Sequence, residues 1–112
     1  MTNQVCNLTD KHCIPCEGNV APLTREEFMP LLAEAVGWEV VEDAKIVKEY
    51  RFADFAAALA FVNKVGALAE SEGHHPDISL HNFNTVTVTL WTHAIGGLSE
   101  NDFIVAAKIN TL

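Results

Sequence analysis

The stretch Thr85–Thr92 reads TVTVTLWT and is the clearest strand signal in this chain of 112 residues. Its valines and its leucine fall on one face of a strand, and its threonines fall on the other. Such alternation of β-branched and apolar residues is typical of an antiparallel sheet with one buried face. A second strand is expected at Ile78–His81, joined to the first by a turn at Asn82–Asn84.

The residues that precede this hairpin predict a long helix and a second hairpin. The helix runs from Phe55 to about Ser71, with Asp54 as its N-cap and Gly73 as its end. Before it, residues 38–42 and 46–52 alternate between apolar and polar side chains and predict two further strands.

Capping signals place one helix at each end of this arrangement. Thr24 and Glu27 have the spacing of a capping box, and Ser99 and Asp102 repeat that spacing before Phe103 and the last apolar residues. The expected order is α-β-β-α-β-β-α. The sequence therefore predicts an α+β fold, in which a four-stranded antiparallel sheet is covered on one face by helices.

Composition excludes several classes of function. The chain is 49% hydrophobic and carries a formal charge of −8, with seven Lys and Arg against fifteen Asp and Glu. A disordered chain is excluded by the hydrophobic content. No basic patch is available for phosphates or for an anionic membrane surface, so we expect neither nucleic-acid nor membrane partners.

The first 22 residues differ from the remainder. They hold all three cysteines and two prolines without periodicity, so we expect an N-terminal arm over 1–22 and a folded domain over 23–112. The opening residues have no basic run followed by an apolar segment, as a signal peptide would. An odd number of cysteines also argues against a secreted disulfide framework, and we expect a cytoplasmic protein.

The long helix is apolar over more than one stripe. Phe55 and Leu59 lie on the main stripe, whereas Phe61 and Leu68 lie on a neighbouring face. This width indicates either a subunit interface or a wide core face, and the pattern does not separate the two.

Four of the five histidines fall between residues 74 and 93. His74 and His75 follow the long helix, and His93 follows the last strand. They are interpretable as surface residues, as a zinc site or as an acid–base site, because imidazole titrates near neutral pH. Adjacent side chains diverge in an extended chain, which makes zinc binding by His74 and His75 together awkward.

The spacing of Glu70, His74, His75, Pro76, Phe83, His93 and Asp102 resembles the signature of the pterin-4a-carbinolamine dehydratases. The segment from Thr92 to Glu100 is also similar to that family. The resemblance covers about residues 23–112 and implies the same α-β-β-α-β-β-α fold. The chain departs from the family at Phe83, where Tyr or Trp is frequent.

The resemblance implies a cofactor-free and metal-free dehydratase (hydro-lyase) acting on 4a-hydroxytetrahydropterin in the recycling of tetrahydrobiopterin after phenylalanine hydroxylation. It implies that His74, His75 and His93 are catalytic and that Glu70, Pro76, Phe83 and Asp102 bind the substrate, with imidazole orientation as the alternative role of Glu70 and Asp102. Glu70 precedes His74 by four residues, which is the spacing of one helical face. It also implies a homodimer or homotetramer. The alternative function is a non-catalytic dimerisation or binding module, because animal members of the family also act as partners of a transcription factor.

The arm carries a second cluster of chemistry-bearing residues. Cys13 and Cys16 form a Cys-x-x-Cys pair, with Cys6 and His12 nearby. Such a pair can hold zinc, but a second pair is missing, so a metal-free arm is the favoured interpretation.

Overall fold

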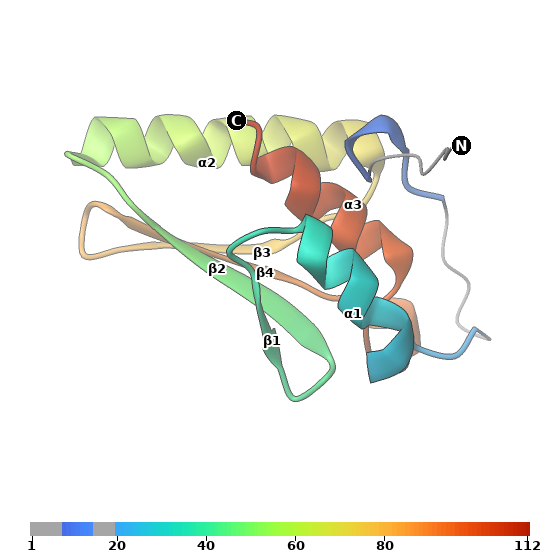
Figure 1. The fold of residues 1–112 in the computed structure, drawn as a ribbon. Helices are drawn as coiled ribbons and strands as arrows, with labels where there is room; N and C mark the ends of the chain where they lie inside the picture. Colours follow the sequence, from blue (N-terminus) through green and yellow to red (C-terminus); the bar gives the residue numbers. More distant parts are fainter. Residues whose placement is uncertain (1–7, 15–19) are drawn as a thin grey trace.

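The computed structural model describes residues 8–14 and 20–112 and has the expected order of elements (Figure 1). A short 3-10 helix, η1, spans Leu8–Asp10, and a second, η2, spans His93–Ile95. The helices are α1 (Arg25–Glu34), α2 (Phe55–Glu72) and α3 (Glu100–Ile109). The strands are β1 (Glu39–Val41), β2 (Lys45–Arg51), β3 (Asp77–His81) and β4 (Thr85–Leu90).

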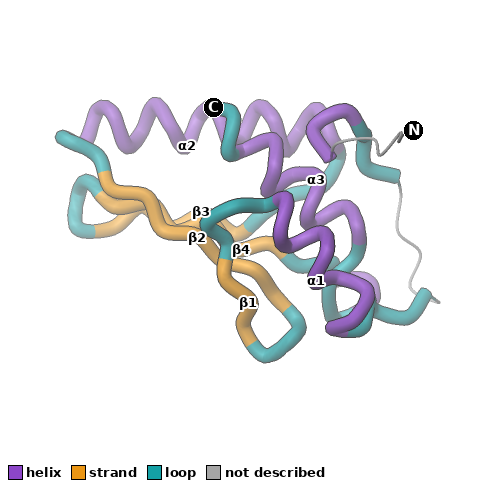
Figure 2. Tube along the Cα trace, in the orientation of Figure 1, coloured by secondary structure: helices purple, strands orange, loops and turns teal. Residues whose placement is uncertain are grey.

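The strands form one antiparallel sheet in the order β1-β2-β4-β3, so the predicted fold class is confirmed. Figure 2 shows the helices gathered on one side of this sheet. Val86, Val88 and Leu90 of β4 are fully buried toward the helices, whereas Thr87 and Thr89 on the opposite face are half-buried. The alternation in the central strand therefore determines which face of the sheet receives the helices.

Three predicted helix ends are formed as expected. The Thr24 hydroxyl accepts the Glu27 N–H at the start of α1, and Asp54 Oδ1 accepts the Ala57 N–H at 2.8 Å at the start of α2. At the other end of α2, Gly73 adopts a left-handed conformation with φ of 67°. A residue with a Cβ is strained there, so glycine ends the helix and turns the chain toward β3.

The wide apolar surface of α2 is a core face. Phe61 is 8% exposed and its ring lies 4.5 Å from that of Tyr50, and Leu68 also packs against the core. The main-stripe residues Phe55 and Leu59 are instead 50% and 43% exposed. Of the two alternatives, the core face holds for Phe61 and Leu68, because Phe61 contacts the sheet and Leu68 packs against the core of their own chain.

The described part of the arm packs against the domain. Leu8 is 1% exposed and belongs to the hydrophobic core, and η1 lies against α3. Lys11 forms an ion pair with Glu100 at 2.6 Å. Residues 8–14 are thus attached to the helical layer. Among the described residues, no helix has the length and apolar character needed to cross a membrane.

Candidate functional site

A pocket of about 660 Å³ opens where α2 and β4 end. Three groups of residues line it. The first is Glu72–Asp77, from the end of α2 to the start of β3, and the second is Trp91–Ala94, after β4. The third is Asn101 of α3 with Cys13 and Ile14 of the arm. Antiparallel pairing sets Asp77 opposite Thr89, which brings the start of β3 beside the end of β4. The three histidines of the predicted site, at positions 74, 75 and 93, therefore line one pocket.

His74 is held by a buried carboxylate. Its Nε2 lies 2.6 Å from Asp102 Oδ1, the His74 side chain is 12% exposed, and the Asp102 side chain has no exposed surface. Since a carboxylate only accepts hydrogen bonds, His74 Nε2 carries the hydrogen and Nδ1 remains as the acceptor when the ring is neutral. This arrangement is the one by which a buried acid orients a catalytic imidazole.

Asp102 also receives two donors from other elements. Its Oδ2 accepts the Thr92 hydroxyl at 2.8 Å and the Ser99 N–H at 3.0 Å. Of the two roles left open for Asp102, the geometry favours orientation of an imidazole over contact with the substrate, because this fully buried carboxylate with three donors is not among the residues that line the pocket. Asp102 contacts His74 and, from the first turn of α3, caps the start of that helix.

His75 has a more exposed carboxylate partner. Its Nε2 lies 2.9 Å from Glu70 Oε1, with the two side chains 63% and 82% exposed. The sequence placed Glu70 on the helical face of His74, four residues later. Because α2 ends at Glu72 and the chain turns at Gly73, Glu70 meets His75 instead.

His93 is exposed, and its ring lies against that of Trp91 with the centroids 4.1 Å apart and the planes tilted by 39°. Lys45 Nζ lies 4.3 Å from the centroid of the Trp91 ring. The indole N–H of Trp91 is buried and has no hydrogen-bond partner among the described residues. Trp91 lines the pocket beside His93.

Two further predicted binding residues have different outcomes. Pro76 lines the pocket. Phe83 does not, because it lies in the turn between β3 and β4, at the end of the hairpin opposite Asp77. It is 61% exposed and has a positive φ of 55°. The structure of one chain therefore does not bring Phe83 to the site, because the β3–β4 turn lies at the end of the hairpin away from Asp77.

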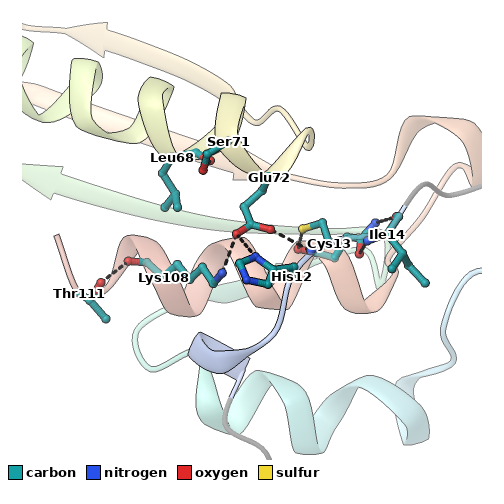
Figure 3. A network of polar contacts seen from close by, with 9 residues as sticks. His12, Cys13, Ile14, Leu68, Ser71, Glu72, Lys108 and Thr111 are labelled. Atoms are coloured by element: carbon teal, nitrogen blue, oxygen red, sulfur yellow. Dashed lines mark hydrogen bonds and ion pairs between the residues drawn. The ribbon is translucent and has the colours of Figure 1, made fainter.

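Glu72 is a functional candidate that the sequence did not single out. Its side chain is 4% exposed, and its Oε2 accepts hydrogen bonds from Lys108 Nζ at 2.6 Å and His12 Nδ1 at 3.1 Å (Figure 3). Its Oε1 accepts the Cys13 N–H at 2.8 Å. Burial disfavours its ionised form, but these donors prevail and hold the pKa of Glu72 at about 2.

Of the four residues proposed as metal candidates, the structure describes His12 and Cys13, and both contact the Glu72 carboxylate. Burial, and then the charge of Glu72, raise the pKa of the Cys13 thiol to about 12. His12 bonds to Glu72. Cys6 and Cys16 lie outside the described residues, and within residues 8–14 and 20–112 no group of three ligand-type side chains converges.

The fold and the pocket together define a small α+β protein whose histidine–carboxylate pairs are suited to proton transfer. A model of the pterin 4 alpha carbinolamine dehydratase family matches residues 21–112. The chain therefore belongs to that family, as the sequence resemblance predicted.

Individual relatives agree with this assignment. A Rickettsia bellii protein, named provisionally as a pterin-4-alpha-carbinolamine dehydratase, is 49% identical and covers 96% of this chain and 95% of its own length. The Arabidopsis thaliana protein named pterin-4-alpha-carbinolamine dehydratase 2, mitochondrial, is 44% identical, and the match covers 96% of this chain and 61% of that protein.

Solved structures of relatives share the fold. A Brucella melitensis protein described as a transcriptional coactivator/pterin dehydratase has a TM-score of 0.73 and 34% identity, over 80% of this chain and 96% of that one. A pterin dehydratase-like protein identified as a RuBisCO assembly factor has a TM-score of 0.57 and 25% identity, over 70% and 90% of the two chains.

The contacts of Glu72 predict a specific pH dependence of stability. Because the folded pKa of about 2 lies below the ordinary 4.5, the stabilisation is complete above pH 4.5 and is lost as the pH falls toward 2. Glu72→Gln should lower the free energy of unfolding at pH 7 by about 2–3 kcal/mol and flatten its decline below pH 5. Urea unfolding between pH 2.5 and 7 measures both effects.

Glu49→Gln is the matched control, since Glu49 is exposed on β2 and should leave the pH dependence unchanged. If Glu72→Gln lost stability in parallel with the wild-type protein below pH 5, the contribution assigned to Glu72 would be contradicted.

Proposed function

We propose that this protein is a dehydratase that converts 4a-hydroxytetrahydropterin to quinonoid dihydropterin and water by histidine acid–base catalysis. The observation that carries the proposal is the buried pairing of His74 with Asp102, beside the second pairing of His75 with Glu70. Membership of the dehydratase family supplies the substrate class.

The reaction needs one proton acceptor and one proton donor at separate atoms. The N5 proton leaves and its electron pair forms the C4a–N5 double bond, while the C4a–O bond breaks with its electrons going to oxygen. Hydroxide is a poor leaving group, so an acid must protonate it as it departs as water. Each assisted transfer is worth about 10²- to 10⁴-fold in rate.

We assign the role of general base, which accepts the N5 proton, to His74. Its Nε2 hydrogen is engaged by Asp102, so the neutral ring has only the Nδ1 lone pair to offer to the substrate. When Nδ1 takes the N5 proton, the buried carboxylate stabilises the resulting imidazolium. This pairing therefore favours proton acceptance over proton donation.

We assign the acid to His75. Its exposed ring can take a proton from water, and Glu70 at 2.9 Å stabilises the charged form. The protonated ring then donates to the departing hydroxyl. His93, in contact with Trp91, is assigned mainly to binding the pterin, because both flat rings line the pocket.

The physiological role follows from the substrate class. 4a-Hydroxytetrahydropterin is left by aromatic amino acid hydroxylases, so we propose that the reaction supports tetrahydropterin recycling in the cytoplasm. None of the steps assigned to these histidines requires a metal or a cofactor from the chain.

A non-catalytic role is the second candidate, and the solved relatives favour keeping it. One is described as a transcriptional coactivator/pterin dehydratase and another as a RuBisCO assembly factor. A binding module would need the fold but not the histidine–carboxylate pairs. Turnover of chemically generated carbinolamine by the purified protein separates the two.

We also propose a homo-oligomer, through residues different from those that the sequence indicated. Phe55 and Leu59 of α2 are exposed, and so is Phe83 in the β3–β4 turn. Figure 1 shows the start of α2 and this turn at the same end of the molecule, opposite the end of α2. Three exposed large apolar side chains at one end are consistent with a subunit interface.

Light scattering tests the assembly. The wild-type protein should be a dimer or larger at micromolar concentration, and Leu59→Glu should shift it toward monomer because a charge would be buried in the interface. Val36→Glu places the same charge at another exposed apolar site and should have no effect. A monomeric wild-type protein would contradict the proposal.

Kinetics of histidine variants test the catalytic assignment. His74→Ala and His75→Ala should each lower kcat by about 10²-fold or more, and the double variant should lose less than the product of the two, because both act in one elimination. His93→Ala should act more on KM than on kcat. Steady-state rates must be corrected for spontaneous dehydration of the carbinolamine.

The pH profiles distinguish base from acid. His74→Ala should remove the acidic limb of the kcat profile, and His75→Ala the basic limb.

Activity should also survive exhaustive chelation. Near-native kcat/KM in both single variants, or loss with EDTA that zinc restores, would overturn the assignment.

A further inference from the structure

The arm contributes one side of the pocket. Cys13 and Ile14 both line it, together with the residues that carry the histidines. Ile14 is 71% exposed, so its side chain gains little from burial in the folded protein. A large apolar side chain in this position raises the question of what it contacts.

The backbone of Ile14 is fixed in place by a single side chain. Asn101 Oδ1 accepts the Ile14 N–H at 3.1 Å, and Asn101 Nδ2 donates to the Ile14 carbonyl at 2.6 Å. Asn101 lies in the first turn of α3 and is only 5% exposed. A nearly buried amide thus satisfies both backbone groups of one exposed residue.

A second contact fixes the preceding residue. Glu72 Oε1 accepts the Cys13 N–H at 2.8 Å, while Lys108 and His12 occupy the other oxygen of the same carboxylate (Figure 3). Figure 3 shows this part of the arm lying along α3 beside the end of α2. Ile14 therefore lines the pocket on a backbone that hydrogen bonds hold in place at two successive residues, Cys13 and Ile14.

The arm is also anchored at its C-terminal end, next to the folded domain. The Leu23 N–H donates to the Leu98 carbonyl at 2.8 Å. Pro22 packs so closely on Gly97 that a Cβ added to Gly97 would lie 2.7 Å from the Pro22 Cβ. Residues 22 and 23 are thus attached to the segment between β4 and α3 that carries His93, whereas residues 12–14 are attached to Glu72 of α2 and Asn101 of α3.

From these contacts we infer that Ile14 is a substrate-binding residue that covers a face of the bound pterin ring, with Asn101 and Glu72 as the positioning residues that hold it there. The inference rests on the proposed function. A pterin has polar edges, which suit histidines and carboxylates, and flat apolar faces, which gain free energy from contact with an aliphatic side chain.

Binding and kinetics of Ile14→Ala test the inference. Removing the distal methyl and methylene groups should raise KM for the carbinolamine, and the Kd of the stable pterin 7,8-dihydrobiopterin, by about 5- to 30-fold. The kcat should stay within about twofold of wild type, because Ile14 moves no proton. Val36→Ala, equally exposed but outside the pocket, is the matched control and should change neither constant.

Asn101→Ala tests the positioning role. It removes both hydrogen bonds to Ile14 while leaving the Ile14 side chain, so it should reproduce the rise in Kd and KM with little effect on kcat. Combining it with Ile14→Ala should add little, because both changes remove one contact. Should Asn101→Ala fail to fold, Ile14→Val, with an expected rise of about 2- to 4-fold, gives a graded second point.

The outcomes separate this inference from the proposed function. A protein that turns over the carbinolamine, but whose Kd and KM are indifferent to Ile14→Ala, overturns the role of Ile14 alone. A protein without turnover, whose binding of 7,8-dihydrobiopterin is weakened by Ile14→Ala, overturns the dehydratase function alone. Absence of both binding and turnover overturns both.

Discussion

The carboxylate of Asp102 is the interaction on which the site depends. It accepts hydrogen bonds from Thr92 after β4, from Ser99 before α3 and from His74 after α2. The segments after α2, after β4 and before α3 therefore meet at one buried side chain, and His74 comes from 28 residues away in the sequence. An unpaired buried carboxylate costs free energy, so Asp102 requires these donors, and its carboxylate in turn holds each donor in place. The helix cap and the orientation of the imidazole are one structural feature.

Much of the fold could be predicted because its signals are local. The alternation in Thr85–Thr92 identifies the central strand and its buried face, and Asp54 and Gly73 mark the ends of α2. The pocket could be predicted in outline for the same reason. Both His74 and His93 follow the ends of regular elements, and antiparallel pairing brings those ends together.

Predictions failed where a tertiary contact decides the outcome. Glu70 pairs with His75 because the turn at Gly73 ends the helical spacing that sequence reasoning extended to His74. Phe61 faces the sheet of its own chain. Glu72 gave no signal in the sequence, since its partners Lys108, His12 and Cys13 come from a distant helix and from the arm. No short-range pattern encodes such a meeting.

Asp102 fixes the tautomer of His74, and ¹H–¹⁵N correlation spectroscopy of the histidine side chains measures that tautomer. At a pH where the ring is neutral, His74 should carry its hydrogen on Nε2, with a proton protected from exchange by the short contact to Asp102. The Nδ1–H form, or a rapidly exchanging mixture of the two tautomers, would contradict it.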